Sequence, residues 1–341
     1  MEFDRQCPES VDDRVCLVVR SRRFRQLHLL WTSISRTPSI STIEIKVEGV
    51  HMDDGSVSAF AGTASGRAFD ERYDRVLGKW GVPVEGVDVE TRHGTTRVNV
   101  SGPTTAPPVI LLAGGGATST SWLAVAGELT ATHRVFAVDH LGDVGRSVIR
   151  ERMRDVDDLV DWLADVLDAL GLASVAVIGH SYGAMVGLAF TIRNPDRVDR
   201  LVLVDPNSCF AGFRTGYLLR AMPLLIRPTG VRQRALIDWE TAGVEVDPDW
   251  LELVAFGAEH FPATRPVVPR RPRQNELCAV GCPMTVVLAG RSRVHDIRRV
   301  EARVRESVPT ARTVVVDAAT HYTLPMTAAA DLLAVLNEAL R

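Results

Sequence analysis

A serine enclosed by two glycines is the residue of this sequence with the clearest chemical potential. It lies in Gly179-His180-Ser181-Tyr182-Gly183, between the apolar run VAVI and a segment of helical character. A strand-to-helix turn is tight, so glycines two residues before and two after the serine leave room for the backbone. The turn presents the hydroxyl at a helix N-terminus, where negative charge is stabilised. The pattern predicts that Ser181 is a nucleophile, and an ordinary glycine-rich turn is the alternative.

A serine hydroxyl needs a base and donors that stabilise developing negative charge. Among nine histidines, His321 stands out because it lies between the last apolar strand and the last helix, in VVVDAATHYTLP. A loop there shares the sheet edge of Ser181, although a surface histidine is the alternative interpretation. The stretch LLAGGGATSTSW follows another apolar strand. We therefore predict that the backbone amides of Gly115 and Tyr182 form an oxyanion hole.

Apolar strands alternate with helices from Pro107 onward, and these elements must position the candidate side chains. Continuous apolar strands separated by helices indicate an α/β fold with a doubly wound, mostly parallel sheet. Two segments of alternating polarity within 84–102 predict a hairpin around Gly94. The strands are predicted within 107–116, 133–139, 173–179, 199–205, 284–290 and 312–317, and the helices at 68–80, 155–170, 184–193 and 327–340.

One long interval interrupts this alternation. Between Asp205 and Met284 the chain has proline-broken helical pieces and no clear buried strand, and a structureless loop of that length is improbable in a compact domain. We predict a helical cap over 206–276, inserted into a core formed by 67–205 and 277–341. Its apolar side chains either contact an apolar acyl or aryl substrate or pack the cap onto the core; they are Phe210, Phe213, Tyr217, Leu218, Leu225, Trp239 and Trp250.

The N-terminal segment, 1–66, carries little pattern. Residues 1–51 have no sustained period, so we expect a poorly ordered segment or one that precedes the true start, with Met52 as a plausible initiator. Acidic residues near the N-terminus argue against a signal peptide, and no apolar run reaches the length of about 18 residues that spans a bilayer.

Composition narrows the classes of function. The formal net charge of −3, from 39 basic and 42 acidic residues, gives no general affinity for nucleic acid or an anionic membrane. Five scattered cysteines predict free thiols in a reducing cytoplasm, without zinc-ligand spacing. No dinucleotide or P-loop motif is present. We therefore expect a cytoplasmic protein with a small-molecule substrate and no cofactor or metal; its oligomeric state is left open.

Four motifs, LLAGGGATSTSW, VDHLGDVGRS, GHSYG and THYTLP, occur in an order that resembles the α/β-hydrolase fold superfamily over about residues 67–341. The chain departs from that family at two positions. Ala113 stands where a histidine usually precedes the glycines. Arg293, in AGRSRVHD, stands where the acid of the catalytic triad is common, and an arginine would oppose an imidazolium.

Two aspartates could replace the missing acid. Asp205 ends the strand that follows the nucleophile helix, a place that some family members use, but before a proline it could simply form a turn. Asp296 lies three residues beyond the usual point, and its alternative role is an N-cap of helix 297–307. A site without any acid is the third possibility.

The resemblance implies a serine hydrolase that cleaves a carboxylic ester or related acyl bond through an acyl-enzyme. A carbon–carbon bond hydrolase or a cofactor-free perhydrolase would use the same residues. The rival from another class is a non-catalytic ligand-binding protein on this fold, which the departures at Ala113 and Arg293 favour.

Overall fold

The computed structural model describes residues 14–20, 42–48, 56–262, 266–326 and 329–341, and divides into two units, Met1–Asp53 and Asp54–Arg341. In the first unit, β1 (Arg14–Arg20) and β2 (Thr42–Glu48) form a parallel pair, with Arg14 opposite Thr42 and Arg20 opposite Glu48. The segment 1–66 thus contains two strands and the short helix α1 (Ser56–Ala61) of the second unit.

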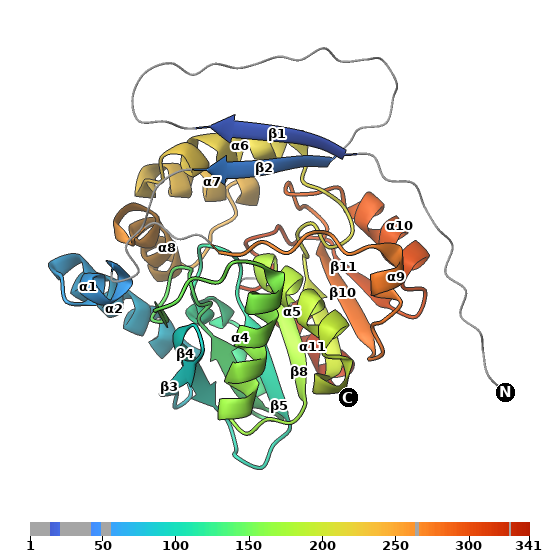
Figure 1. The fold of residues 1–341 in the computed structure, drawn as a ribbon, viewed down its shortest axis with the longest axis horizontal. Helices are drawn as coiled ribbons and strands as arrows, with labels where there is room; N and C mark the ends of the chain where they lie inside the picture. The colour runs from blue at the N-terminus through green and yellow to red at the C-terminus, as the bar shows by residue number, and fades with distance from the viewer. Residues whose placement is uncertain (1–13, 21–41, 49–55, 263–265, 327–328) are drawn as a thin grey trace. The chain divides into compact units, whose positions relative to one another are not determined.

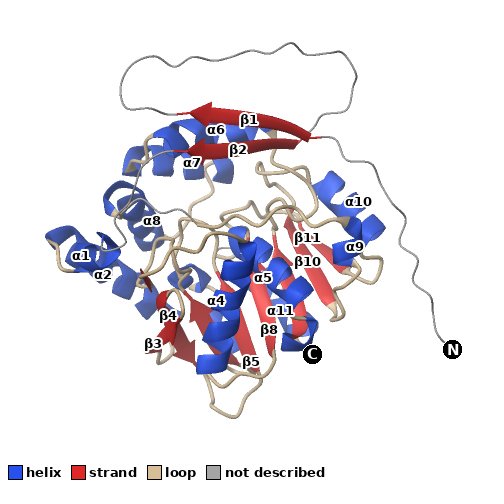
Figure 2. Ribbon diagram, viewed as in Figure 1, coloured by secondary structure: helices blue, strands red, loops and turns tan. Residues whose placement is uncertain are grey.

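A mixed sheet forms the centre of the second unit (Figure 2). Its order is β11-β10-β9-β8-β5-β6-β4-β3, with β7 paired to β4. Along this order the strands from β11 to β6 are parallel to one another, whereas β3, β4 and β7 pair antiparallel. The doubly wound, mostly parallel sheet predicted from the sequence is confirmed. The strands are β3 (Glu85–Thr91), β4 (Gly94–Ser101), β5 (Pro108–Leu112), β6 (Arg134–Val138), β7 (Val148–Ile149), β8 (Val175–His180), β9 (Val198–Val204), β10 (Met284–Ala289) and β11 (Arg312–Val316).

Helices cover both faces of the parallel part of this sheet, which is why the run PVILL of β5 is apolar throughout. On β5, Ile110 and Leu112 pack in the cluster of α4, α5 and α10, while Val109 and Leu111 pack in the cluster of α3 and α11. This alternation buries both faces. The helices are α2 (Ala64–Leu77), α3 (Ala126–Leu129), α4 (Val156–Ala169), α5 (Tyr182–Arg193), α6 (Thr215–Ile226), α7 (Gly230–Thr241), α8 (Pro248–His260), α9 (Gln274–Leu277), α10 (Ile297–Ser307) and α11 (Ala329–Ala339).

Two helix starts differ from the predicted ones, and a capping group explains one of them. The helix predicted from residue 68 begins at Ala64, because the Thr63 side chain accepts the N–H of Gly66. The helix predicted from residue 184 begins at Tyr182, directly after Ser181. The hairpin prediction is accurate, with β3 and β4 joined at Gly94, where φ is +149°.

The segment between β9 and β10 contains α6, α7, α8 and α9. Figure 1 shows α6, α7 and α8 grouped beyond one end of the central strands. The helix α8 packs against α7 and α2, and Trp250 joins Phe69 and Tyr73 in one buried cluster. None of the helices among the described residues is both long and apolar enough to cross a bilayer.

The expectation of free thiols needs one correction. Cys209 and Cys282 are free, but Cys278 is disulfide-bonded. Scattered spacing does not exclude a bond, since pairing depends on Cα atoms approaching within about 7 Å after folding.

Candidate active site

The sharp turn between β8 and α5 presents Ser181. Its backbone adopts φ 55° and ψ −112°, a conformation that is unusual for a residue with a side chain. A Cβ atom on Gly179 would lie 2.3 Å from the Gly183 carbonyl oxygen, and one on Gly183 would lie 2.1 Å from that of Leu112. Both glycines are therefore sterically required, as the sequence pattern indicates.

The structure brings Ser181, His321 and Asp205 together. The Nε2 atom of His321 lies 3.0 Å from Ser181 Oγ, and its Nδ1 lies 2.6 Å from Asp205 Oδ2. The three residues are 6%, 2% and 0% exposed, respectively. They follow β8, β11 and β9, whose carboxyl ends meet at one edge of the sheet. The result is a continuous hydrogen-bonded chain of acid, imidazole and hydroxyl.

The second candidate acid, Asp296, is not brought to this chain. It is exposed and caps α10, accepting backbone N–H groups of the first helical turn. The other departure, Arg293, directs its guanidinium to the Trp239 carbonyl oxygen, 2.5 Å away. Asp205 is therefore the carboxylate that contacts His321 in this structure.

Sequence reasoning missed three donors that surround Asp205. Its Oδ1 accepts the Ala289 amide and His295 Nε2, and its Oδ2 accepts the Ser292 hydroxyl, each at 3.0 Å. Burial would raise the pKa of Asp205, but the charge and hydrogen bonds of His295 and His321 hold it well below its usual range. Burial likewise opposes a charged His295, but Asp205 keeps the pKa of that imidazole raised.

The stretch after β10 carried the available signal for two of these donors. Ser292 and His295 flank Arg293, in the same loop in which the family resemblance places an acid. The sequence could have suggested them as supports of an acid supplied by a neighbouring strand.

The glycine-rich loop after β5 lies against the turn that presents Ser181. A Cβ atom on Gly115 would lie 3.4 Å from the Tyr182 Cβ. Tyr182 opens α5, so its N–H has no acceptor within the helix. The loop is held by His140, whose Nε2 donates to the Ala113 carbonyl oxygen at 2.9 Å. His140 thus supports the loop from outside it, where the usual histidine is replaced by Ala113. The oxyanion-hole role of the two amides stays a prediction.

Two buried groups fix the backbone of the His321 loop. The Nε2 atom of His180 donates to the His321 carbonyl oxygen at 3.1 Å, and burial lowers the pKa of His180 to about 3, so that its ring is neutral. The fully buried carboxylate of Glu240, at the end of α7, accepts the amides of His321 at 3.0 Å, Tyr322 at 3.3 Å and Arg293 at 3.2 Å. A helix of the inserted segment therefore anchors the loop that carries the imidazole.

Another missed residue contacts the hydroxyl itself. The Nδ2 atom of Asn207 donates to Ser181 Oγ at 2.6 Å. Asn207 lies two residues after Asp205, in the sequence DPN, for which a turn is the alternative interpretation from sequence.

The polar side chains of this site form hydrogen bonds with one another. In the ranges that the structure describes, no three histidine, cysteine, aspartate or glutamate side chains are grouped as ligands of a metal ion. The arrangement can do proton transfer and nucleophilic attack: a neutral imidazole accepts a proton from the hydroxyl while a carboxylate stabilises the imidazolium.

Two of the curated proteins that this chain resembles are named carboxylesterases. The chain is 35% identical over 183 residues to carboxylesterase YbfK of Bacillus subtilis (strain 168), covering 53% of this chain and 60% of that protein. It is 32% identical over 160 residues to the uncharacterized carboxylesterase nap of the same organism, covering 47% and 53%. The alignments thus span little more than half the length of these curated relatives.

Solved structures extend the likeness to most of the chain. The crystal structure of carboxylesterase CesB (YbfK) from Bacillus subtilis matches with a TM-score of 0.75 at 26% identity, covering 81% of this chain and 98% of that one. The naproxen esterase structure from Bacillus subtilis gives the same TM-score and coverage at 24% identity. A family model for the alpha/beta hydrolases matches residues 109–335, two thirds of the sequence. The chain therefore belongs to the alpha/beta hydrolase family.

Proposed function

We propose that this protein is a serine hydrolase that cleaves a carboxylic ester or a related acyl bond. The hydrogen-bonded chain from Asp205 through His321 to Ser181 is the observation that carries the proposal. The carboxylesterase names of the two curated relatives and of the matching crystal structures support the choice of an ester. No cofactor is needed for this chemistry.

In the proposed mechanism, Ser181 Oγ forms a bond to the carbonyl carbon while its proton passes to His321 Nε2. The carbonyl oxygen becomes an oxyanion, to which the amides of Gly115 and Tyr182 donate. Asp205 stabilises the imidazolium and fixes the tautomer through Nδ1. The C–O bond to the leaving alcohol then breaks, and the alcohol takes the proton from His321. Water, deprotonated by the same imidazole, cleaves the acyl-enzyme and releases the acid.

The segment 206–276 is proposed as a cap over this site. Its contacts with the His321 loop through Glu240 support that role. Within the segment, the Phe213 ring stacks on Tyr217 with centroids 5.6 Å apart. Tyr217 interacts with Tyr322, whose ring centroid lies 5.4 Å from that of the catalytic imidazole. These rings support an apolar acyl or aryl substrate.

Other aromatic residues of the cap serve packing. Phe210 is buried in the main core cluster, and Trp250 donates its indole N–H to Ser121 Oγ at 3.1 Å. Packing is therefore the role of these two residues, and substrate contact is proposed for Phe213 and Tyr217.

The structure weakens the case for a non-catalytic binding protein. That case depended on Arg293 and Ala113. Asp205 contacts His321 although Arg293 occupies the usual acid position, and His140 supports the loop at Ala113. At each departure from the family pattern another residue thus supplies the missing group, which favours an enzyme.

Labelling with a fluorophosphonate probe tests the proposal. We expect an adduct on Ser181 in the wild-type protein and none in Ser181→Ala, with p-nitrophenyl ester hydrolysis lost in the same variant. A screen of acyl chain lengths beside vinylogous diketones separates an esterase from a carbon–carbon bond hydrolase. Absence of a Ser181-dependent adduct would contradict the proposed chemistry.

A further inference from the structure

The turn after β9 delivers two polar side chains to the site. Asp205 reaches His321 Nδ1, and Asn207 reaches Ser181 Oγ. This short turn contains two non-glycine residues with positive φ, Asp205 at 40° and Ser208 at 50°. Such conformations are costly and persist where the surrounding structure determines them. The strained backbone therefore positions both an acid and an amide at the nucleophile and its base.

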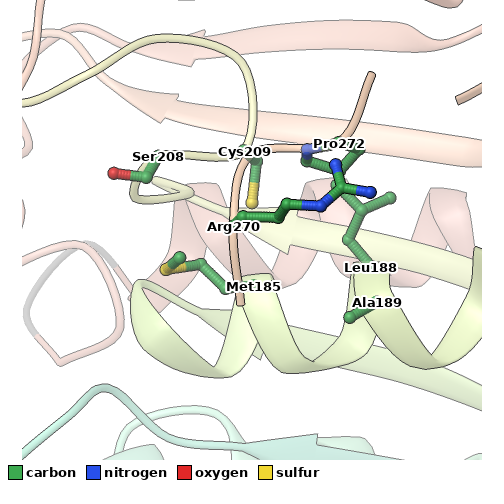
Figure 3. Close-up of a pocket in the computed structure, with 7 residues that line it drawn as sticks. All are labelled: Met185, Leu188, Ala189, Ser208, Cys209, Arg270 and Pro272. Carbon is green, nitrogen blue, oxygen red and sulfur yellow. The ribbon is translucent and has the colours of Figure 1, made fainter. Parts of the chain in front are cut away.

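Packing holds the Asn207 side of this turn in place. Ser208 and Cys209 line a small pocket together with residues of α5, the helix that begins next to Ser181 (Figure 3). The other residues lining it are Met185, Leu188, Ala189, Arg270 and Pro272. Arg271 Nε also donates to the Ser208 carbonyl oxygen at 3.3 Å. The turn and the nucleophile are thus fixed against the same helix.

Only one end of the Asn207 side-chain amide forms a hydrogen bond among the residues that the structure describes. While Nδ2 donates to Ser181 Oγ, the Oδ1 atom is buried without a partner among the residues that the structure describes. A buried carbonyl oxygen without a hydrogen bond destabilises the fold. The hydrogen bond that this side chain makes is thus directed at the reacting oxygen.

We propose that Asn207 is a catalytic residue whose hydrogen bond to Ser181 Oγ stabilises the negative charge that this oxygen gains as its proton leaves and as it departs from the acyl carbon. The inference rests on the proposed function. During acylation, the Oγ proton moves to His321 as the bond from Oγ to the acyl carbon forms. During deacylation, water adds to that carbon, the bond to Oγ breaks, and Oγ regains a proton from His321. Hydrogen bonds to a charged oxygen are stronger than to a neutral one, so Asn207 assists both steps.

Substitutions of similar shape test this role. In Asn207→Leu the branched shape of the side chain is kept and the donor is lost, so we expect the fluorophosphonate labelling rate and the rate of acyl-enzyme hydrolysis to fall about 10- to 100-fold, with KM little changed. In Asn207→Asp a carboxylate faces Oγ. It should slow both steps further, because a negative charge beside Oγ opposes the negative charge that this oxygen gains.

Two further variants separate catalysis from folding. Asn207→Ser keeps a short O–H donor and should recover part of the rate lost in Asn207→Leu, and Asn275→Leu, at an exposed position, should behave as wild type. Wild-type rates in Asn207→Leu would overturn the inference alone. Equal losses in the Leu and Ser variants, with equally lowered melting temperatures, would also overturn it. Absence of hydrolysis by the wild-type enzyme would overturn both this inference and the proposed function.

Discussion

We predict that His295 stabilises the folded protein through its contact with Asp205. Replacing it with Asn or Ala would also leave a cavity in the protein interior, which would confuse the measurement. We therefore choose His295→Phe, which keeps an aromatic ring and removes the nitrogen atoms. In the wild-type protein, His295 Nε2 lies 3.0 Å from the fully buried Asp205 Oδ1. The variant leaves that oxygen with one donor, the Ala289 amide.

The expected loss follows from the charge on Asp205. A hydrogen bond to a charged group contributes about 1.5–3 kcal/mol, and for a unit of this size such a loss lowers Tm by about 2–5 °C. The pKa of His295 is raised in the fold. Its charged form therefore adds stability below its unfolded pKa of about 6.5, and that part is lost as pH rises through the higher folded pKa. The difference between wild type and variant should be larger at pH 6 than at pH 9.

Urea unfolding followed by circular dichroism at several pH values measures this difference. The matched control is His260→Phe, at an exposed position of α8, which should show no comparable pH dependence. Equal unfolding free energies for wild type and His295→Phe at both pH values would refute this reasoning.

Further predictions concern other parts of the site. Asp205→Asn should lower kcat about 10⁴-fold, as expected for the loss of a triad acid, whereas Asp296→Ala should lower Tm slightly and leave kcat unchanged, as steady-state kinetics and thermal melts will show. Glu240→Gln turns an amide group toward three backbone donors, so the unfolding free energy should fall by about 1–3 kcal/mol in urea titrations, and kcat should fall with it. Gly179→Ala would place a methyl group 2.3 Å from a carbonyl oxygen, and circular dichroism should find no folded protein.

The sheet could be predicted because its strands carry their own signal. The run PVILL of β5 is apolar at every position, since helices cover both of its faces. Helix α4 was equally clear: Asp155 caps its first turn, and Gly171 follows its end at φ +69°. The two glycines of the nucleophile turn have a local steric cause, so the position of Ser181 could be predicted as well.

The surroundings of the triad could not be predicted in the same way. His295 and Asn207 contact groups that are 90 and 26 residues away in sequence, and no local pattern says which atoms their side chains contact. The choice between Asp205 and Asp296 could not be made from the sequence for the same reason, because it depends on a contact with a residue that is distant in sequence. Both follow a strand of the same sheet edge, and local patterns do not say which carboxylate faces the imidazole and which caps a helix.

The presence of an aspartate directly after β9 and of an arginine in the loop after β10 can be explained together. Because β9 and β10 are neighbours in a parallel sheet, their following loops converge, and either can supply a carboxylate to the His321 loop. Once Asp205 takes that role, the β10 loop has to stabilise a buried anion, and Ser292 and His295 donate to it. A second carboxylate at position 293 would face the same site and raise the pKa of one of the pair. Arg293 instead turns outward to the inserted segment, whose Glu240 receives its amide. The arginine at position 293 is thus consistent with an acid that is supplied from the neighbouring strand β9 instead of from β10.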